Sequence, residues 1–231
     1  MYALIIYGPP GAGKGTQANL LADALDGTHI DTGKYLEEIV NDPARQNDPV
    51  IQHEKKLFDE GLLLTPGFVL PLIKARAAEV GRARMSVIFS GIPRTLYDAF
   101  GDATTIGLLA ELEKYYKKNN IVIIYLETLP ELSLTSNSSR LVCSVCSRPV
   151  LNRDRLDRKY CDFCGGELRK RSLDNPEAIK VRLQEFENKT LPLITEFKNH
   201  GYQVETLDSA PPPYQIFQKI ISLLKALPHE S

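Results

Sequence analysis

The sequence predicts an α/β fold in three layers, with a five-stranded parallel sheet between two layers of helices. Three observations lead to this class: five short β-rich runs, helical patterns between them, and a glycine-rich loop directly after the first run. Strands that alternate with helices are typical of βαβ units, whose parallel sheets are covered on both faces. The expected strands are residues 2–7, 28–31, 86–89, 121–126 and 202–207.

The first expected strand runs into the loop GPPGAGKGT at residues 8–16, and a helical pattern follows. Glycines let backbone N–H groups curve around an anion, and the start of a helix adds the positive end of its dipole. The loop therefore predicts a phosphate site. The apolar residues expected on the sheet-facing side of the helix are Leu20, Leu21, Ala24 and Leu25.

Two stretches interrupt the alternation and are expected to be insertions. Residues 32–64 have the pattern of short helices, and residues 136–172 have little periodicity but contain all four cysteines. The core is then expected to comprise residues 1–31, 65–135 and 173–231. A long helical pattern begins near residue 175, and Pro192 must kink or interrupt it because proline removes a backbone donor.

Composition limits the class of protein. The 231 residues are 43% hydrophobic, enough for one core that carries small insertions. The formal net charge of −1 is not that of a protein that binds nucleic acid or a membrane surface, and no stretch has the length and hydrophobicity of a membrane span. We expect a cytoplasmic protein without nucleic-acid or membrane partners.

The four cysteines form two close pairs, Cys143-x2-Cys146 and Cys161-x2-Cys164, with fourteen residues between the pairs. This spacing is typical of two knuckles that close one tetrahedral zinc site, and four thiolates leave no open coordination position. We therefore expect a structural Zn²⁺ that supplies folding free energy to a segment too short and polar to bury a core. The alternative is four free thiols.

The loop also carries a family signature. Its candidate phosphate-binding residues are Gly8, Pro9, Pro10, Gly11, Ala12, Gly13, Lys14, Gly15 and Thr16. A P-loop places Ser or Thr directly after the lysine, whereas here Gly15 precedes Thr16. GPPGAGKGTQ resembles the loop of the adenylate kinase family, and so do, in order, DTG at 31–33, GIPRT at 91–95, CGGEL at 164–168, VRL at 181–183 and KTLPL at 189–193.

The resemblance implies a P-loop NTPase-type core with a clamp over the nucleoside monophosphate (NMP) at 32–64 and a zinc-bearing lid at 136–172. It implies reversible, Mg²⁺-assisted phosphoryl transfer from ATP to AMP by a monomer. Lys14 would hold the donor phosphates and Arg94 the acceptor phosphate. The residues implied around the transferring group are Arg140, Arg171 and Arg182, and those implied in the acceptor pocket are Thr32, Gly91 and Leu64.

Charge supports a lid that closes over an anion. Residues 140–171 hold nine Lys and Arg residues against four Asp and Glu residues, although the whole chain is slightly acidic. Moving a phosphoryl group between nucleotides requires several positive charges and the exclusion of water. A solvated basic insertion would have a similar composition.

Five positions depart from the family pattern. The altered residues are Lys34 and Glu37 in the clamp, Ser90 in place of an aspartate that helps to hold Mg²⁺, Asp98 in place of an adenine-reading glutamine, and Ser136 in place of an arginine. Under one hypothesis Lys34 or Arg45 supplies charge at the acceptor, and Asp98 favours another base such as guanine. Under the other, the chain binds ATP with little or no transferase activity.

Overall fold

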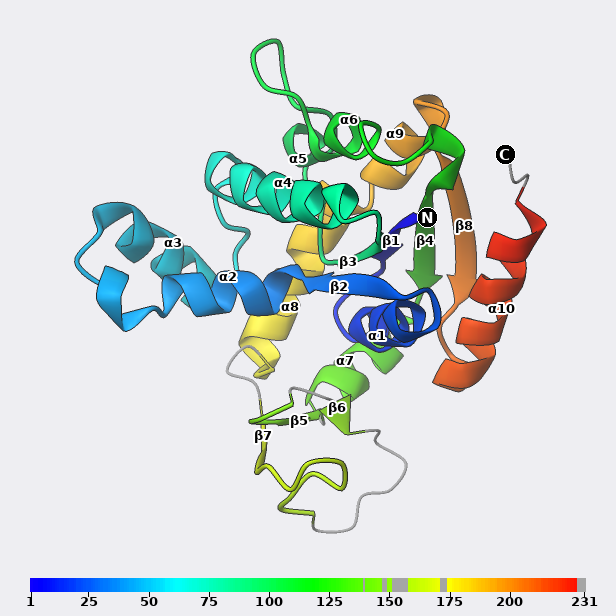
Figure 1. The fold of residues 1–231 in the computed structure, drawn as a ribbon. Helices are drawn as coiled ribbons and strands as arrows, with labels where there is room; N and C mark the ends of the chain where they lie inside the picture. Colours follow the sequence, from blue (N-terminus) through cyan, green and yellow to red (C-terminus); the bar gives the residue numbers. More distant parts are fainter. Residues whose placement is uncertain (139, 147–148, 151–157, 171–173, 228–231) are drawn as a thin grey trace.

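The centre of the molecule is a five-stranded parallel sheet, ordered β2-β3-β1-β4-β8 (Figure 1). The structure is a computed structural model that describes residues 1–138, 140–146, 149–150, 158–170 and 174–227. The strands are β1 (Ala3–Tyr7), β2 (Gly27–Asp31), β3 (Ser86–Ser90), β4 (Ile121–Glu127) and β8 (Gln203–Asp208). Every bound lies within one residue of its expected position, so the α/β fold class is confirmed.

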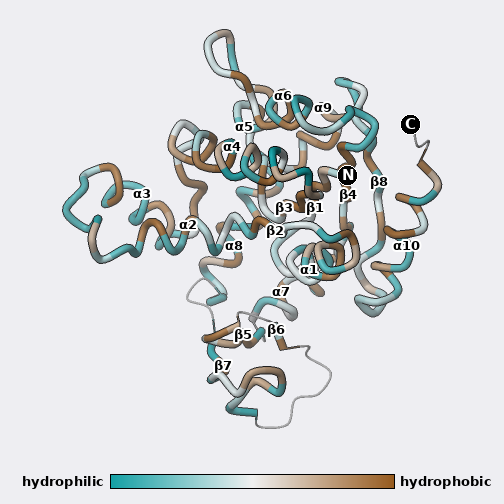
Figure 2. The backbone as a smooth tube through the Cα atoms, in the orientation of Figure 1, coloured by the Kyte–Doolittle hydropathy of each residue, from teal (hydrophilic) through white to brown (hydrophobic). Residues whose placement is uncertain are grey.

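Helices cover both faces of the sheet. On one face α1 (Lys14–Ala24) and α10 (Pro213–Ala226) pack against the side chains of Leu4 and Ile6. On the other face α4 (Pro66–Arg82), α6 (Leu108–Leu112) and α9 (Leu193–Asn199) contribute to the larger hydrophobic cluster. All five residues of β1 are buried, and Figure 2 shows hydrophobic colour along this central strand. A strand covered on both faces is hydrophobic at every position.

The buried face of α1 matches the expected one only in part: Leu21 is buried and Leu25 packs against the same cluster. The buried residues of the helix are Gln17, Ala18, Leu21 and Ala22, whereas Ala24 is exposed. Gln17 can be buried because its side-chain Nε2 donates to the carbonyl of Pro213, at 2.9 Å, where α10 begins. Hydrophobicity alone could not predict this face, because a long-range hydrogen bond keeps a polar side chain in the core.

Three short helices lie between β2 and α4 and project from the core (Figure 1): α2 (Thr32–Val40), η1 (Pro43–Arg45) and α3 (Pro49–Asp59). Each begins after an aspartate whose side chain accepts a backbone N–H, as is typical of helix N-caps. These aspartates are Asp31, Asp42 and Asp48.

A second protrusion follows α7 (Pro130–Ser138) and contains a three-stranded antiparallel sheet. Its order is β6-β5-β7, with β5 at Leu141–Cys143, β6 at Pro149–Val150 and β7 at Leu168–Arg169. The division of the chain into core, clamp and lid stays a prediction.

The expected interruption at Pro192 is confirmed. Helix α8 (Pro176–Glu185) continues into a π-helical turn at Phe186–Thr190, where the N–H of Leu191 donates to the carbonyl of Phe186. Helix α9 starts directly after the proline. The other short helices are α5 (Leu96–Phe100) and η2 (Lys118–Asn120). Across the described residues, no helix has both the length and the apolar character needed to span a membrane.

Candidate active site

A cleft of about 840 Å³ lies where the carboxyl ends of the central strands meet the N-terminus of α1. In open parallel sheets this edge is the usual ligand site. Eight of the nine predicted loop residues line the cleft, and the ninth, Pro9, contributes a carbonyl that accepts from Lys14. The phosphate loop therefore forms one wall of the cleft.

The backbone of the loop requires glycine where it leaves β1. Gly8 has a φ of 148°, and a Cβ atom there would lie 2.7 Å from the carbonyl oxygen of Leu126 in β4. Lys14 Nζ donates to the carbonyls of Gly8 and Pro9, both at 2.8 Å, so its ammonium lies over the loop. The loop thus curves around the side chain of Lys14, the first residue of α1.

The charges around Lys14 are mostly positive. Burial lowers the pKa of Lys14 well below its usual range, and the charges of Arg182, Arg94 and Arg140 lower the pKa further. Asp31 acts in the opposite direction and raises the pKa. Four cationic side chains gathered in one cleft repel one another, and an anionic ligand would relieve this repulsion.

Helix α7 packs against the phosphate loop and donates a hydrogen bond to it, a role that no motif in the sequence indicated. Ser133 Oγ donates to the carbonyl of Pro10, and Asn137 Nδ2 donates to the carbonyl of Ser133, at 2.9 Å. A Cβ atom at Gly11 would lie 2.7 Å from both Asn137 Nδ2 and the carbonyl oxygen of Ser133. Ser133 and Asn137 are both completely buried.

The structure brings Arg94, Arg140 and Arg182 to the cleft, while Arg171 lies outside the described residues. Arg140 and Arg182 share the buried carboxylate of Asp174, which the sequence analysis missed. Arg140 donates to both of its oxygens at 2.9 and 2.6 Å, and Arg182 Nη1 lies 3.6 Å away. The side chain of Asp174 is 1% exposed and fixes the Arg140 guanidinium in a fork-like contact.

A second cavity of about 80 Å³ adjoins the cleft, and Gly61, Leu63, Gly91, Ile92, Arg94 and Arg182 are among the residues that line both. Thr32 and Leu64 line only the second cavity. Two buried polar atoms of its lining, Thr32 Oγ1 and Asp98 Oδ1, make no hydrogen bond within the described part of the chain. Buried polar atoms normally have partners, so these two indicate a place for a polar ligand.

Asp98 has a structural role that its sequence position did not reveal. Its Oδ2 accepts the backbone N–H groups of Arg94 and Thr95, both at 3.1 Å, and Thr95 Oγ1 accepts the N–H of Asp98 in return. This capping box starts α5. Burial raises the pKa of Asp98, and the hydrogen bonds from Arg94 and Thr95 lower it in part.

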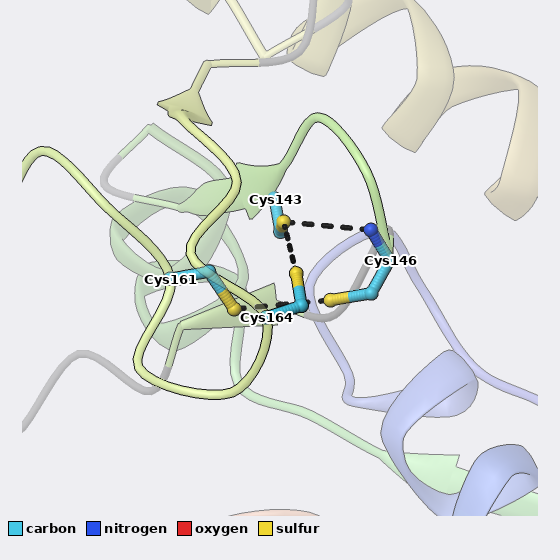
Figure 3. Close-up of side chains that lie close together, drawn as sticks. All are labelled: Cys143, Cys146, Cys161 and Cys164. Carbon is cyan, nitrogen blue, oxygen red and sulfur yellow. Dashed lines mark hydrogen bonds between the residues drawn. The ribbon is translucent and has the colours of Figure 1, made fainter.

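The four cysteines converge within the second protrusion (Figure 3). Their sulfur atoms all lie within 4.8 Å of one another, with 3.4 Å between Cys143 and Cys164 and 3.8 Å between Cys146 and Cys161. Zn–S bonds of 2.3 Å in a tetrahedron give S···S distances of about 3.8 Å, so the donor set fits zinc. Backbone N–H groups, of Cys146 above all, lower the pKa of Cys143 to about 6.

Comparison with known proteins decides the family. The sequence model described as adenylate kinase matches residues 6–202. The chain belongs to the adenylate kinase family. It is 34% identical over 203 residues to the adenylate kinase of Caldicellulosiruptor saccharolyticus, covering 87% of this chain and 89% of that protein. It is 33% identical to the adenylate kinase of Methanosarcina acetivorans, with 96% and 97% covered, and 32% identical to that of Chlamydia trachomatis serovar D, with 96% and 90% covered. Membership supports phosphoryl transfer between ATP and AMP.

The departures from the adenylate kinase pattern fall into two groups. Ser90 and Ser136 line the larger cleft and Asp98 lines the smaller cavity, so these changes lie at the site. Lys34 and Glu37 line neither cavity, and neither does Arg45, the other cation considered for the acceptor. Lys34 is paired with Glu38 and Arg45 with Asp48 on the surface of the protruding helices. This geometry does not place either cation at an acceptor phosphate.

Proposed function

We propose that this adenylate kinase family member transfers the terminal phosphoryl group of ATP to AMP reversibly, giving two molecules of ADP. The observation that carries the proposal is the shared wall of the two cavities. The phosphate loop lies in the larger cavity, and Arg94, Arg182 and Gly91 line both. A donor phosphate held by the loop would therefore meet an acceptor phosphate at these side chains.

The donor would be held by the loop N–H groups and by Lys14. The ammonium of Lys14 already lies over the loop, bonded to two carbonyls, and would exchange these contacts for phosphate oxygens. A negative ligand would raise the pKa of Lys14 from its lowered value and keep the ammonium charged. Binding of the triphosphate and charging of the lysine therefore favour each other.

Transfer would depend on positioning and electrostatics. Arg94 would place the acceptor phosphate, and Arg140 and Arg182 would neutralise the oxygens of the transferring group. Asp174 acts through these arginines, since it fixes the plane of the Arg140 guanidinium. Arg171 is proposed for the same group of charges from the family pattern alone. Closure of lid and clamp would exclude water, which would otherwise accept the phosphoryl group.

Asp98 supports adenine as the acceptor base. A carboxylate binds guanine by accepting its two adjacent N–H donors with both oxygens, but Oδ2 of Asp98 already accepts two backbone N–H groups. Only Oδ1 lacks a partner among the described residues, and one acceptor matches the single exocyclic amino group of adenine. The geometry therefore does not favour the guanine hypothesis.

Two metal ions belong to the proposal. Mg²⁺ would arrive with ATP and neutralise charge on its phosphates, and the hard oxygen donors in the cleft, such as Thr16 and Asp31, fit it. Zn²⁺ would bind Cys143, Cys146, Cys161 and Cys164 as a structural ion. Of the described residues from 141 to 170, only Cys143 and Cys161 are buried, so this segment has little core of its own.

The proposal is tested by mixing the purified protein with Mg·ATP and, separately, AMP, GMP, CMP or UMP, and resolving the nucleotides formed. We expect ADP from AMP, several-fold less diphosphate from the other acceptors, and loss of activity in Lys14→Ala. If no acceptor reacts while ATP still binds, the chain is a nucleotide-binding protein. A cytoplasmic location and a monomeric state stay predictions.

A further inference from the structure

The structure places a carboxylate next to the position where the family pattern has lost one. We propose that Asp31 takes the place of the aspartate missing at Ser90 and holds the magnesium of Mg·ATP through bound water. The inference rests on the proposed function and gives Asp31, one oxygen donor of the cleft, a specific role in it. No motif assigns this role to Asp31, which the sequence analysis named only as the first residue of DTG.

Strand register brings the two positions together. Strands β2 and β3 pair in parallel, and Asp31 lies directly opposite Ser90 as the last pair of residues. Paired residues on neighbouring strands are about 4.8 Å apart and point their side chains to the same face of the sheet. A carboxylate at Asp31 is thus displaced by one strand from the position at Ser90, without a change of face.

That face is the one that carries the phosphate loop. Ser90 pairs with Ile6 of β1, and Ile6 packs in the same hydrophobic cluster as Ala18 and Leu21 of α1. Residues two apart in a strand share a face, so Ile88 of this cluster and Ser90 lie on one side. Asp31 therefore lies at the edge of the sheet where α1 begins, together with Thr16 of the loop in the lining of the cleft.

The carboxylate of Asp31 lies close enough to the loop to act electrostatically on Lys14. It raises the pKa of Lys14, against the effects of burial and of three arginines. The cleft lining described contains one other carboxylate, Glu185, which is paired with Lys189 at 2.8 Å. Asp31 is thus the acidic side chain that remains for a cation at the loop.

One oxygen of Asp31 is available to water. Oδ1 caps α2 by accepting the N–H of Lys34 at 3.2 Å, whereas Oδ2 has no partner among the described residues. Bound Mg²⁺ keeps several waters, and a carboxylate that accepts from these waters helps to hold the ion. One side chain can therefore cap the helix and face the cation.

Ser90 is itself engaged by neighbouring side chains. His29 Nδ1 lies 2.7 Å from Asn19 Oδ1, and His29 Nε2 lies 2.7 Å from Ser90 Oγ. Because the amide oxygen can only accept, Nδ1 carries the proton, and in a neutral ring Nε2 accepts from the Ser90 hydroxyl. Burial lowers the pKa of His29 and so favours this neutral ring.

The test measures the dissociation constant of ATP by calorimetry in EDTA and in excess MgCl₂. The ratio of the two constants is the magnesium enhancement of ATP binding. Asp31→Asn removes the charge but keeps an N-cap side chain for α2. The matched control is Asp42→Asn, since Asp42 also caps a helix, through Ala44, but lines neither cavity. The double variant Asp31→Asn/Ser90→Asp returns the carboxylate to β3.

We expect Asp31→Asn to lower the magnesium enhancement about tenfold or more, the usual effect of losing a side chain that orients metal-bound water. In EDTA this variant should bind ATP at least as tightly as the native protein, because a carboxylate that repels phosphate has gone. Asp42→Asn should leave the enhancement within about twofold of native, and the double variant should recover it.

Two results would overturn the assignment. One is an unchanged enhancement in Asp31→Asn; the other is an equal loss of ATP affinity with and without magnesium, which would indicate a role in loop structure only. Failure of the native protein to bind ATP under either condition would instead overturn the proposed function. The two failures are therefore distinguishable.

Discussion

Replacement of Asp174 by asparagine tests the packing of the active-site arginines most directly. The carboxylate is 1% exposed, accepts two hydrogen bonds from Arg140 and lies 3.6 Å from Arg182. Hydrogen bonds to charged groups contribute about 1.5–3 kcal/mol each, and removal of one partner of a buried ion pair costs about 3–5 kcal/mol. Asparagine keeps one acceptor, and both guanidiniums are about one-fifth exposed and partly hydrated. We therefore expect the low end of this range, about 3 kcal/mol.

For a chain of this length, each kcal/mol lowers the melting temperature by about 2–4 °C. Thermal unfolding followed by circular dichroism should therefore show Asp174→Asn melting about 6–12 °C below the native protein. Asp59→Asn is the matched control, because Asp59 is 57% exposed and its ion pair with Lys55 lies on the surface. That variant should melt within about 2 °C of native. Equal melting temperatures for the two variants would refute the assignment of Asp174 as the anchor of these arginines.

Three further predictions concern other parts of the molecule. Gly8→Ala should lower the free energy of unfolding measured in urea by about 1–3 kcal/mol, because its Cβ would contact the carbonyl of Leu126 and its φ is positive. In the control Gly67→Ala the new Cβ meets no atom within 4 Å, so the free energy of unfolding should stay unchanged or rise. An equal loss in both variants would contradict the steric reason. Purified protein should contain about one zinc per chain by elemental analysis, and removal by a chelator should expose residues 141–170 to proteolysis; a metal-free protein with a protected lid would refute the zinc site. Because burial lowers the pKa of His29, the unfolded state binds its proton first as pH falls through about 6.5, so the free energy of unfolding should decrease below that pH. His29→Gln should reduce this slope in urea titrations at pH 5–7, and an unchanged slope would show that other groups cause it.

Local sequence was sufficient for the sheet and for the phosphate loop. Strands with continuous apolar residues, such as residues 121–126, are typical of a sheet buried between helices, so the positions of the strands and the parallel type of the sheet followed from the alternation along the chain. The two cysteine pairs likewise predicted the cluster of sulfurs, because the two cysteines of each Cys-x2-Cys pair lie three residues apart, on one turn of the backbone. These features depend on residues that lie close together in the chain.

Other parts of the site depend on contacts between distant segments. The pairing of Arg140 with Asp174 crosses thirty-four positions, and the support of Pro10 by Ser133 crosses 123. The polar Gln17 enters the core through a carbonyl at Pro213. Hydrophobic periodicity contains no information about such partners, so these residues could not be selected from the sequence.

The sequence by itself determined the fold class, the phosphate loop, the cysteine cluster and the adenylate kinase resemblance, because each depends on local spacing. Only the tertiary structure decided how the altered positions combine. From the sequence alone, Ser90 indicated only that a magnesium-holding aspartate was missing. The register of β2 against β3 places Asp31 beside this position. From the sequence alone, Asp98 indicated only that the residue contacting the acceptor base had changed. In the structure, one of its carboxylate oxygens accepts backbone N–H groups in the capping box. Side chains acquire these roles from neighbours that folding brings to the same edge of the sheet.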